Sequence, residues 1–364
     1  MIIKSLDLES FRNYDRLHLD FSPGTTILYG QNAQGKTNIL EAVSLIASSR
    51  SHRGAKDREM IKKDAEESHI KLIAEKNQIE FRIDMHLKSA GHRGIAVNSV
   101  PVRRSIDYIG TLKCVIFSPE DLQLVKEGPQ LRRRFIDTEL CQLDKIYLDA
   151  LVRYRKALDQ RNQLLKDISF EPSLYDTLDI WDEQLAESGR EIINRRSEFI
   201  KELSEITEPV YAGLSGGKES LKLSYEPDVY ADEFAETLYK NRSRDLKNKV
   251  TGNGPHRDDV AFDLDGMDAR IYGSQGQQRT CVLALKLAEL ELVKQRAGEN
   301  PVLLLDDVMS ELDAERQNDL LKSIRGVQTL ITCTGIEDFI SHGFNADEIY
   351  RISQGTAEKM LREE

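Results

Sequence analysis

The sequence predicts an α/β protein in which a mainly helical lobe interrupts a lobe of mixed strands and helices. Three observations lead to this prediction. At 364 residues the chain is too long for one compact core. Strand-like alternation dominates both ends of the chain, whereas three-and-four spacing of apolar residues dominates the middle. A short β-branched run, a glycine-rich loop and a helical pattern also follow one another near the start. We therefore divide the chain into residues 1–120, 121–250 and 251–364, the first and third forming the α/β lobe.

The elements of the α/β lobe follow from apolar periodicity. A helix is expected over residues 36–47, with Ile39, Leu40, Val43 and Ile46 on one face, and a long amphipathic helix over Gln277–Arg296. Residues 70–117 return to strand patterns and residues 221–225 alternate like a strand. The strands expected are Ile2–Leu8, Leu17–Phe21, Thr25–Tyr29, Cys114–Phe117, Val260–Leu264, Pro301–Asp306, Thr329–Thr332 and Asp347–Ile352.

The helical middle shows heptad-like spacing on both sides of a short break at Ser169–Ser173. Leu140–Ile168 and Leu178–Val210 could form two antiparallel helices along an apolar seam. Each would have about 30 residues and a length of about 45 Å. Arg161, Gly189 and Arg196 interrupt the seam. A coiled-coil arm and two ordinary core helices therefore both remain open.

Composition excludes several classes of protein. No apolar run approaches the roughly 20 residues that span a bilayer, and the start is too quickly polar for a signal peptide. The four cysteines lie far apart without a CxxC pair, which argues against a zinc or disulfide framework and fits the cytosol. The net charge is −11, so any nucleic-acid contact must come from local basic patches.

Residues 30–37 match the phosphate-loop pattern GxxxxGK(S/T) at every fixed position. A strand precedes the loop and a helix follows it, which is the context that this motif requires. Backbone N–H groups and the helix start favour phosphate oxygens. We expect Lys36 to neutralise the β- and γ-phosphates of ATP and the Thr37 hydroxyl to hold Mg²⁺.

Residues 302–307 supply the partner motif, in which four apolar residues run into two carboxylates. Asp306 is expected at the end of a buried strand, where it would hold Mg²⁺ directly or through water. Asp307 is then expected to orient or deprotonate the attacking water.

Two segments compete for the signature that caps a γ-phosphate. Leu214–Lys218 is closer to LSGGQ, but a strand pattern follows it, so we interpret it as a glycine-rich helix exit. Ser274 begins a strong helix that leads into the 302–306 strand. Because the donors of a helix N-terminus are needed at a phosphate, we choose Ser274.

Taken together, these motifs resemble the RecF family, the SMC-like branch of the ABC ATPases, over nearly the whole chain. The resemblance rests on Leu8–Tyr14, Gly30–Asn38, Phe117–Leu122, Gly254–Asp259, Ser274–Thr280 and Asp306–Asp313. It implies an ABC/SMC-type P-loop ATPase head lobe with an inserted helical lobe. It also implies a homodimer that closes head to tail over two ATP molecules, with Ser274 of one copy capping the γ-phosphate held by Lys36 of the other.

The resemblance implies a set of site residues. Ser310–Asp313 matches the D-loop, and Gln123 is a candidate for the Q-loop glutamine. Asp307 stands where ABC proteins usually have Glu, and Thr332 stands in the region of the missing switch histidine, so we expect weak ATPase activity. The catalytic residues expected are Lys36, Asp307 and Thr332. The nucleotide contacts expected are Arg12, Gly30, Gln31, Asn32, Ala33, Gln34, Gly35, Lys36, Thr37, Asn38, Ser274, Gly276 and Gln277.

The resemblance also implies ATP-dependent binding to duplex DNA near single-strand gaps, with RecR and RecO as partners that help load RecA, in the cytoplasm at the nucleoid. Basic clusters offer phosphate contacts, although a solvated helix face or loop is the better explanation of any single cluster. The DNA-contact candidates are Arg50, Arg53, Arg132, Arg133, Lys240, Arg242, Arg244, Lys247 and Lys249, and nearby are Lys56, Arg58 and Arg134.

Three other functions compete. An ABC transporter subunit is disfavoured for two reasons: the long insertion between Thr37 and Ser274 forms a helical lobe, and the switch histidine is absent. An arm of about 45 Å is too short for an SMC-type tether. A P-loop kinase has no use for the signature and D-loop. His256 lies beside two carboxylates, but no second histidine supports a metal site, and Arg257 is a candidate contact to DNA or nucleotide.

Overall fold

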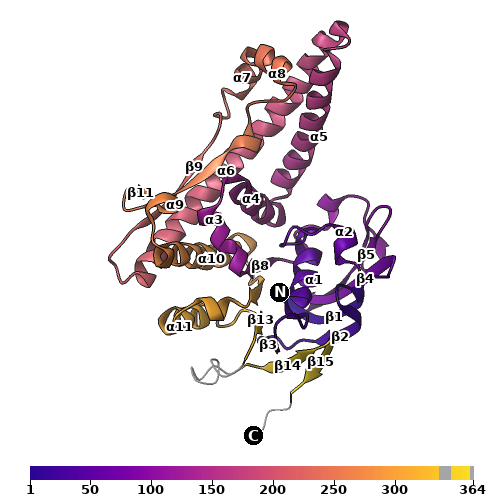
Figure 1. The fold of residues 1–364 in the computed structure, drawn as a ribbon, viewed down its shortest axis with the longest axis vertical. Coiled ribbons are helices and arrows are strands. Elements are labelled where there is room, and N and C mark those ends of the chain that lie inside the picture. Colours follow the sequence, from indigo (N-terminus) through magenta and orange to yellow (C-terminus); the bar gives the residue numbers. More distant parts are fainter. Residues whose placement is uncertain (336–345, 361–364) are drawn as a thin grey trace. The chain divides into compact units, whose positions relative to one another are not determined.

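The computed structural model describes residues 1–335 and 346–360, apart from the side chains of Ser105 and Glu311. The chain forms two compact units, shown in Figure 1. Unit 1 comprises Met1–Leu122 and Lys286–Glu364, and unit 2 comprises Gln123–Leu285. The boundary expected near residue 120 lies at 122, but the one expected at 250 lies at 285.

The first sheet of unit 1 is antiparallel and has the order β2-β1-β4-β5-β6-β7. Its long strands β1 and β4 largely alternate buried and half-buried side chains, as a sheet with one well-covered face does. The strands are β1 (Ile2–Phe11), β2 (Tyr14–Asp20), β4 (Glu67–Lys76), β5 (Ile79–Lys88), β6 (Gly94–Val97) and β7 (Val100–Pro101). The short helices α2 (Asp57–Met60) and η1 (Ser105–Asp107) lie in its connections.

The second sheet has the order β15-β14-β3-β13-β12-β8 and is parallel except for β15. Every residue of β12 and β13 is buried, which explains why their side chains are apolar apart from Asp306, Thr329 and Thr332. The strands are β3 (Thr25–Tyr29), β8 (Cys114–Phe117), β12 (Val302–Asp306), β13 (Thr329–Cys333), β14 (Glu348–Ser353) and β15 (Thr356–Lys359). Because the strands are parallel, their carboxyl ends meet at one edge.

Helix α1 (Lys36–Ser48) contacts both sheets of unit 1. The predicted face of Ile39, Leu40, Val43 and Ile46 is buried, but so are Glu41 and Leu45. The expectation of a single buried face was therefore incomplete, because a sheet lies on each side of the helix. Unit 1 also contains η2 (Pro119–Leu122), η5 (Val308–Glu311) and α11 (Ala314–Ser323).

The helices of unit 2 differ from the predicted pair. The first predicted helix is two helices, α4 (Pro129–Leu143) and α5 (Lys145–Asp167), since Asp144 ends one and caps the next by accepting from the N–H groups of Ile146 and Tyr147. Helix α6 (Leu178–Leu214) is longer than expected and packs along α5 (Figure 1). Short helices complete this part: α3 (Gln123–Lys126), η3 (Pro172–Thr177), α7 (Phe234–Lys240) and α8 (Arg242–Asn248).

A three-stranded antiparallel sheet explains the shifted boundary. Strand β10 (Asp259–Leu264) pairs with β9 (Leu221–Glu226) and β11 (Met267–Asp268). The strand expected at 260–264 therefore belongs to the helical unit. Next come η4 (Pro255–Arg257) before β10, α9 (Ala269–Tyr272) after β11, and α10 (Gln275–Ala297), which runs across the boundary between the units.

The glycine-rich segment after α6 is a helix exit, as predicted. Gly216 and Gly217 adopt positive φ, and the Gly217 N–H bonds back to the carbonyl of Ala212. Among the described residues, no helix has both the length and the apolarity needed to cross a membrane.

Candidate nucleotide site

The phosphate loop lies in unit 1 between the end of β3 and the start of α1. Gly35, the residue before the helix, has φ 111°, and a Cβ there would lie 2.6–2.7 Å from the side chains of Asn13 and Tyr14. Any side chain at this position would therefore be strained and would clash. The Asn38 N–H donates to the Gly35 carbonyl at 2.9 Å, which begins the helix directly after the loop.

Two side chains contact the phosphate loop, Asn13 from the β1–β2 turn and Tyr14 from the start of β2. Asn13 donates from Nδ2 to the Gln34 carbonyl at 3.0 Å, and accepts from Asn38 Nδ2 at 2.8 Å. The Tyr14 hydroxyl donates to the Gly35 carbonyl at 3.0 Å, and burial raises the pKa of this tyrosine, so it stays protonated. Sequence reasoning did not assign either residue a role. The only signal was their place in the Leu8–Tyr14 motif.

Arg12, the residue of that motif expected to contact nucleotide, is engaged elsewhere. Its guanidinium donates to both carboxylate oxygens of Glu41, at 2.7 and 2.8 Å, and to the Glu59 carbonyl at 2.7 Å. Glu41 is fully buried and also accepts from Ser51 at 2.5 Å. Burial alone would raise the pKa of Glu41, but the hydrogen bonds from Arg12 and Ser51 outweigh it, so the pKa is lowered. In this structure Arg12 binds Glu41 of α1, and the residues of the motif that contact the phosphate loop are Asn13 and Tyr14.

Lys36 lies inside the loop, and its ammonium donates to the carbonyls of Gly30 and Gln31 at 2.5 and 2.9 Å. Burial lowers the pKa of Lys36, while the nearby carboxylates of Asp307 and Asp306 oppose that effect. A phosphate anion beside this amine would favour its charged form in the same way.

Asp306 ends β12 directly opposite Thr332 of β13 in the parallel register. Its Oδ1 accepts from the Thr37 hydroxyl at 2.8 Å and from the Thr332 hydroxyl at 2.7 Å. Three predicted site residues are thus brought together. The Thr332 side chain is fully buried and also accepts from the Asp307 N–H at 2.9 Å, so it orients both acids and has no free approach to a ligand.

Asp307 follows the strand in a left-handed conformation, with φ 53°. This turn directs the chain into η5, where the Ser310 hydroxyl donates to the Asp307 carbonyl at 2.7 Å. Asp313 then caps α11 by accepting from the Arg316 N–H. The segment that matches the D-loop is therefore a structured turn between β12 and α11.

The segment chosen as the signature lies in unit 2 and begins α10. Ser274 and Gln277 form a reciprocal cap: the Ser274 N–H donates to Gln277 Oε1 at 2.7 Å, and the Gln277 N–H donates to Ser274 Oγ at 3.2 Å. Gln277 Nε2 also donates to Glu219 at 2.8 Å. Ser274 and Gly276 are exposed, as is Gln123 at the start of α3.

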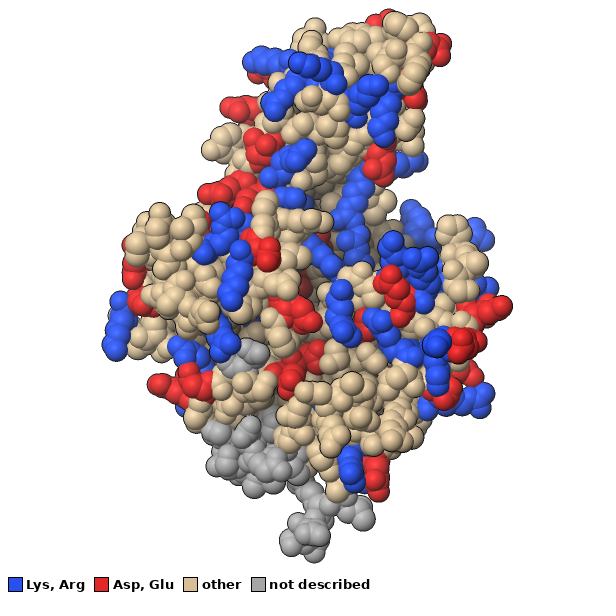
Figure 2. Space-filling model, viewed as in Figure 1, with Lys and Arg blue, Asp and Glu red and all other residues tan. Residues whose placement is uncertain are grey.

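Two of the basic DNA-contact candidates lie in the protein interior. Arg132 donates to both oxygens of Asp259 at 2.6 and 2.8 Å, and Arg242 is held by Asp182 and Asp179. Neither residue is therefore available as a DNA contact, because moving its guanidinium to a phosphate would leave the carboxylates of a buried ion pair without their cation. Lys240 is exposed but paired with Glu236 at 2.5 Å. The remaining candidates keep exposed or half-buried side chains: Arg50, Arg53, Arg133, Arg244, Lys247 and Lys249. Figure 2 shows Lys and Arg gathered over α7 and α8 of unit 2.

Comparison with known proteins identifies relatives over the full length. The family model described as the RecF/RecN/SMC N terminal domain matches residues 2–359. A protein of Lachnoclostridium phytofermentans named DNA replication and repair protein RecF is 54% identical over 359 residues, covering 99% of this chain and 100% of that protein. The protein of the same name from Agathobacter rectalis is also 54% identical, over 98% of this chain and 99% of its own.

Solved structures agree with these relatives. The structure of the recombination mediator protein RecF with ATP, from the RecFOR pathway, matches with a TM-score of 0.93 and 37% identity, covering 99% of this chain and 98% of that chain. An SMC head bound to the C-terminal winged-helix domain of ScpA matches with a TM-score of 0.58 at 17% identity, over 100% of this chain and 98% of its own, and this likeness concerns the fold alone.

Proposed function

Because the chain belongs to the RecF family of SMC-like ATPases, we propose that it is an ATP-dependent DNA-binding protein of recombinational gap repair. The observation that carries the proposal is the cluster of Thr37, Asp306 and Thr332 beside the lysine-bearing loop. Lys36, Thr37 and Asp306 are the groups that an ATP–magnesium complex requires, and Thr332 holds Asp306 in place. The similar solved RecF, described with ATP, supports the same ligand.

The donors fit Mg²⁺. A hydroxyl and a carboxylate 2.8 Å apart are hard oxygen ligands, so Thr37 and Asp306 would hold the ion. When bound, the ion neutralises charge that develops on the transferred phosphoryl group. Lys36 would contribute a second positive charge there, and Gly30–Asn38 would supply the N–H groups of the loop.

Asp307 would accept a proton from, or orient, the attacking water. Its carboxylate is about one methylene closer to the backbone than that of the glutamate usual in ABC proteins, so hydrolysis would be slow. Thr332 would act as a positioning residue, since its hydroxyl fixes Asp306 and the Asp307 backbone. A slow ATPase suits a clamp that stays closed while ATP persists.

Two copies would close head to tail over two ATP molecules. The exposed, capped start of α10 supports this proposal, because Ser274, Gly276 and Gln277 there could reach a γ-phosphate held by another copy. The closed dimer would bind duplex DNA near single-strand gaps and work with RecR and RecO to help load RecA. Such work takes place in the cytoplasm, at the nucleoid.

The proposal is tested by measuring DNA affinity with and without ATP on gapped and fully duplex substrates, at several salt concentrations. We expect ATP to tighten binding by the wild type, with gapped DNA preferred. The matched variant Lys36→Met should bind DNA equally with and without ATP. A wild type that ignores ATP would refute the coupling.

A further inference from the structure

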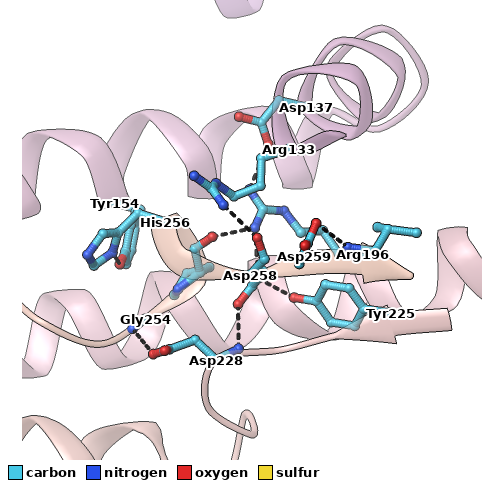
Figure 3. Close-up of polar contacts among 12 residues, drawn as sticks. Arg133, Asp137, Tyr154, Arg196, Tyr225, Asp228, Gly254, His256, Asp258 and Asp259 are labelled. Atoms are coloured by element: carbon cyan, nitrogen blue, oxygen red, sulfur yellow. Dashed lines mark hydrogen bonds and ion pairs between the residues drawn. The ribbon is translucent and has the colours of Figure 1, made fainter. Parts of the chain in front are cut away.

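The loop Thr251–Asp258 of unit 2 is fixed by contacts on several sides (Figure 3). Gly254 has φ 132°, and a Cβ there would lie 2.6 Å from the Tyr154 hydroxyl and 2.8 Å from the Phe234 ring. Its N–H donates to Asp228 at 2.9 Å. Residues other than glycine rarely adopt this backbone conformation, and two aromatic rings enclose it. The loop is therefore held in a single conformation.

The carboxylates around the loop are matched to partners. Asp258 accepts from Arg196 at 2.8 Å, from the Asp228 N–H at 3.0 Å and from the Tyr225 hydroxyl. Asp259 is held by both arms of Arg132. Asp137 accepts from Arg196 at 2.8 Å and from Arg155 at 2.6 Å. Three of the carboxylates beside the loop, those of Asp137, Asp258 and Asp259, are therefore paired with other arginines, whereas Asp228 accepts from the Gly254 N–H and the side-chain amide of Asn253.

Arg133 is the guanidinium beside them that pairs with no carboxylate among the described residues. It extends from α4 toward the loop, where it donates to the Asp258 carbonyl at 2.6 Å (Figure 3). Burial and the neighbouring Arg196 lower the pKa of Arg133, although the carboxylates of Asp258, Asp259 and Asp137 oppose that effect. A half-buried cation next to a second cation would be stabilised by an added anion.

Arg257 supplies a second cation at the end of η4, one residue before the carbonyl that Arg133 contacts. Its side chain is exposed, and within residues 1–335 and 346–360 it has no carboxylate partner.

His256 is the residue before Arg257, and the charges of Arg133 and Arg257 both affect its pKa. Its Nδ1 accepts from the Tyr154 hydroxyl at 2.7 Å, because burial keeps that tyrosine protonated, so Nε2 carries the hydrogen donated to the Thr251 carbonyl at 3.1 Å. With both nitrogens engaged, the ring is no metal ligand in this structure. Burial lowers the pKa of His256; the Thr251 carbonyl and Asp228 oppose this, whereas Arg257 and Arg133 lower it further.

We propose that Arg133 and Arg257 form a phosphate-binding pair on the fixed Thr251–Asp258 loop, and that it takes a backbone phosphate of DNA. The choice of DNA rests on the proposed function. Guanidinium groups match phosphate oxygens with paired hydrogen bonds, and a preformed loop presents them without a large ordering cost. The sequence analysis named Arg133 and Arg257 separately as candidate contacts, and the folded loop is what relates them to each other as a site distinct from residues 240–249.

The first test uses inorganic phosphate as the probe and the His256 imidazole as the reporter. Phosphate bound at the pair would offset the two positive charges, so NMR titration should show the pKa of His256 rising relative to sodium chloride of equal ionic strength. The double variant Arg133→Gln, Arg257→Gln should lose this phosphate-dependent rise. The Arg133→Gln change keeps an amide donor for the Asp258 carbonyl, so the loop should stay folded. An equal rise in both proteins, or none in the wild type, would overturn the pair.

The second test uses duplex DNA with ATP present. Each lost phosphate contact should reduce the slope of log affinity against log salt by about 0.9, so the double variant should lose about two. Arg190→Gln is the matched control, because Arg190 is another exposed arginine of unit 2, on α6, and its slope should stay unchanged. A double variant with the wild-type slope would eliminate the pair while leaving the proposed function intact. Failure of the wild type to bind DNA would instead defeat the proposed function.

Discussion

Single hydroxyl groups order the candidate site at the residue scale. The Thr332 hydroxyl donates to Asp306 and accepts from the Asp307 N–H, and the Tyr14 hydroxyl donates to the Gly35 carbonyl of the phosphate loop. Neither hydroxyl is exposed, so each acts through the residue that it holds. The motifs predicted Lys36, Thr37 and Asp306, because fixed spacing along the chain encodes them. Asn13 and Tyr14 could not be assigned in the same way, because only the folded β1–β2 turn brings them to the loop.

Thr332→Val should reduce ATP turnover by about 10-fold or more while ATP affinity changes little, since losing a group that orients a metal ligand has effects of this size. The matched control is Thr329→Val on the same strand, whose hydroxyl bonds, within the described part of the chain, to the Val327 carbonyl alone. Single-turnover ATP hydrolysis and nucleotide binding check the two variants. Equal loss in both would mean that the strand and not the Asp306 contact is responsible.

The Arg12–Glu41 pair predicts a pH dependence of stability. The pKa of Glu41 lies below its ordinary value of 4.5, so the carboxylate stabilises the fold above about pH 4.5, and this contribution is lost as the pH falls through the lowered pKa. At pH 7 the wild type should therefore unfold at a higher urea concentration than Glu41→Gln. The difference between the two urea midpoints should decrease as the pH falls below 4.5. A gap that widens in acid would contradict the ion pair.

At the scale of secondary-structure elements, buried ion pairs explain how the helices of unit 2 are held together. The residues that interrupt the predicted seam are the ones that join α5 and α6 to the rest of unit 2. Arg161 binds Asp182 and Asp245, Arg196 binds Asp137 and Asp258, and Gly189 admits the Phe234 ring. Apolar periodicity predicted helices here correctly but could not identify the partners of the arginines, which are distant in sequence. It also missed the break at Asp144, a capping event that leaves the apolar spacing unchanged.

Arg196→Met should destabilise unit 2 by about 3–5 kcal/mol, because it leaves the buried Asp258 without its cation and removes one of the two arginines bound to Asp137. The adjacent Arg195→Met removes only half-exposed ion pairs and should cost at most about 1 kcal/mol. Urea unfolding followed by circular dichroism compares the two. Similar losses for both variants would show that the Arg196 network is not a stabilising feature.

The division of the chain into two units matters most for the whole molecule. Unit 1 contains Lys36 and Asp306, whereas unit 2 contains Ser274 at the start of α10. The α/β fold with an inserted helical part was predictable from periodicity and the loop motif. The boundary at 285 was not, because the strand at 259–264 looks like the other strands until its pairing with β9 is known.

Mixing two inactive variants tests the head-to-tail dimer most directly. Lys36→Met and Ser274→Arg should each fail to form ATP-dependent dimers alone. In a mixed pair, one composite site would join an intact Lys36 to an intact Ser274 of the other copy. Sedimentation of the mixture with ATP should therefore recover dimers, and ATP turnover should return to at most about half of the wild-type rate. A mixture that remains monomeric, or a Ser274→Arg protein that dimerises normally by itself, would contradict the shared site.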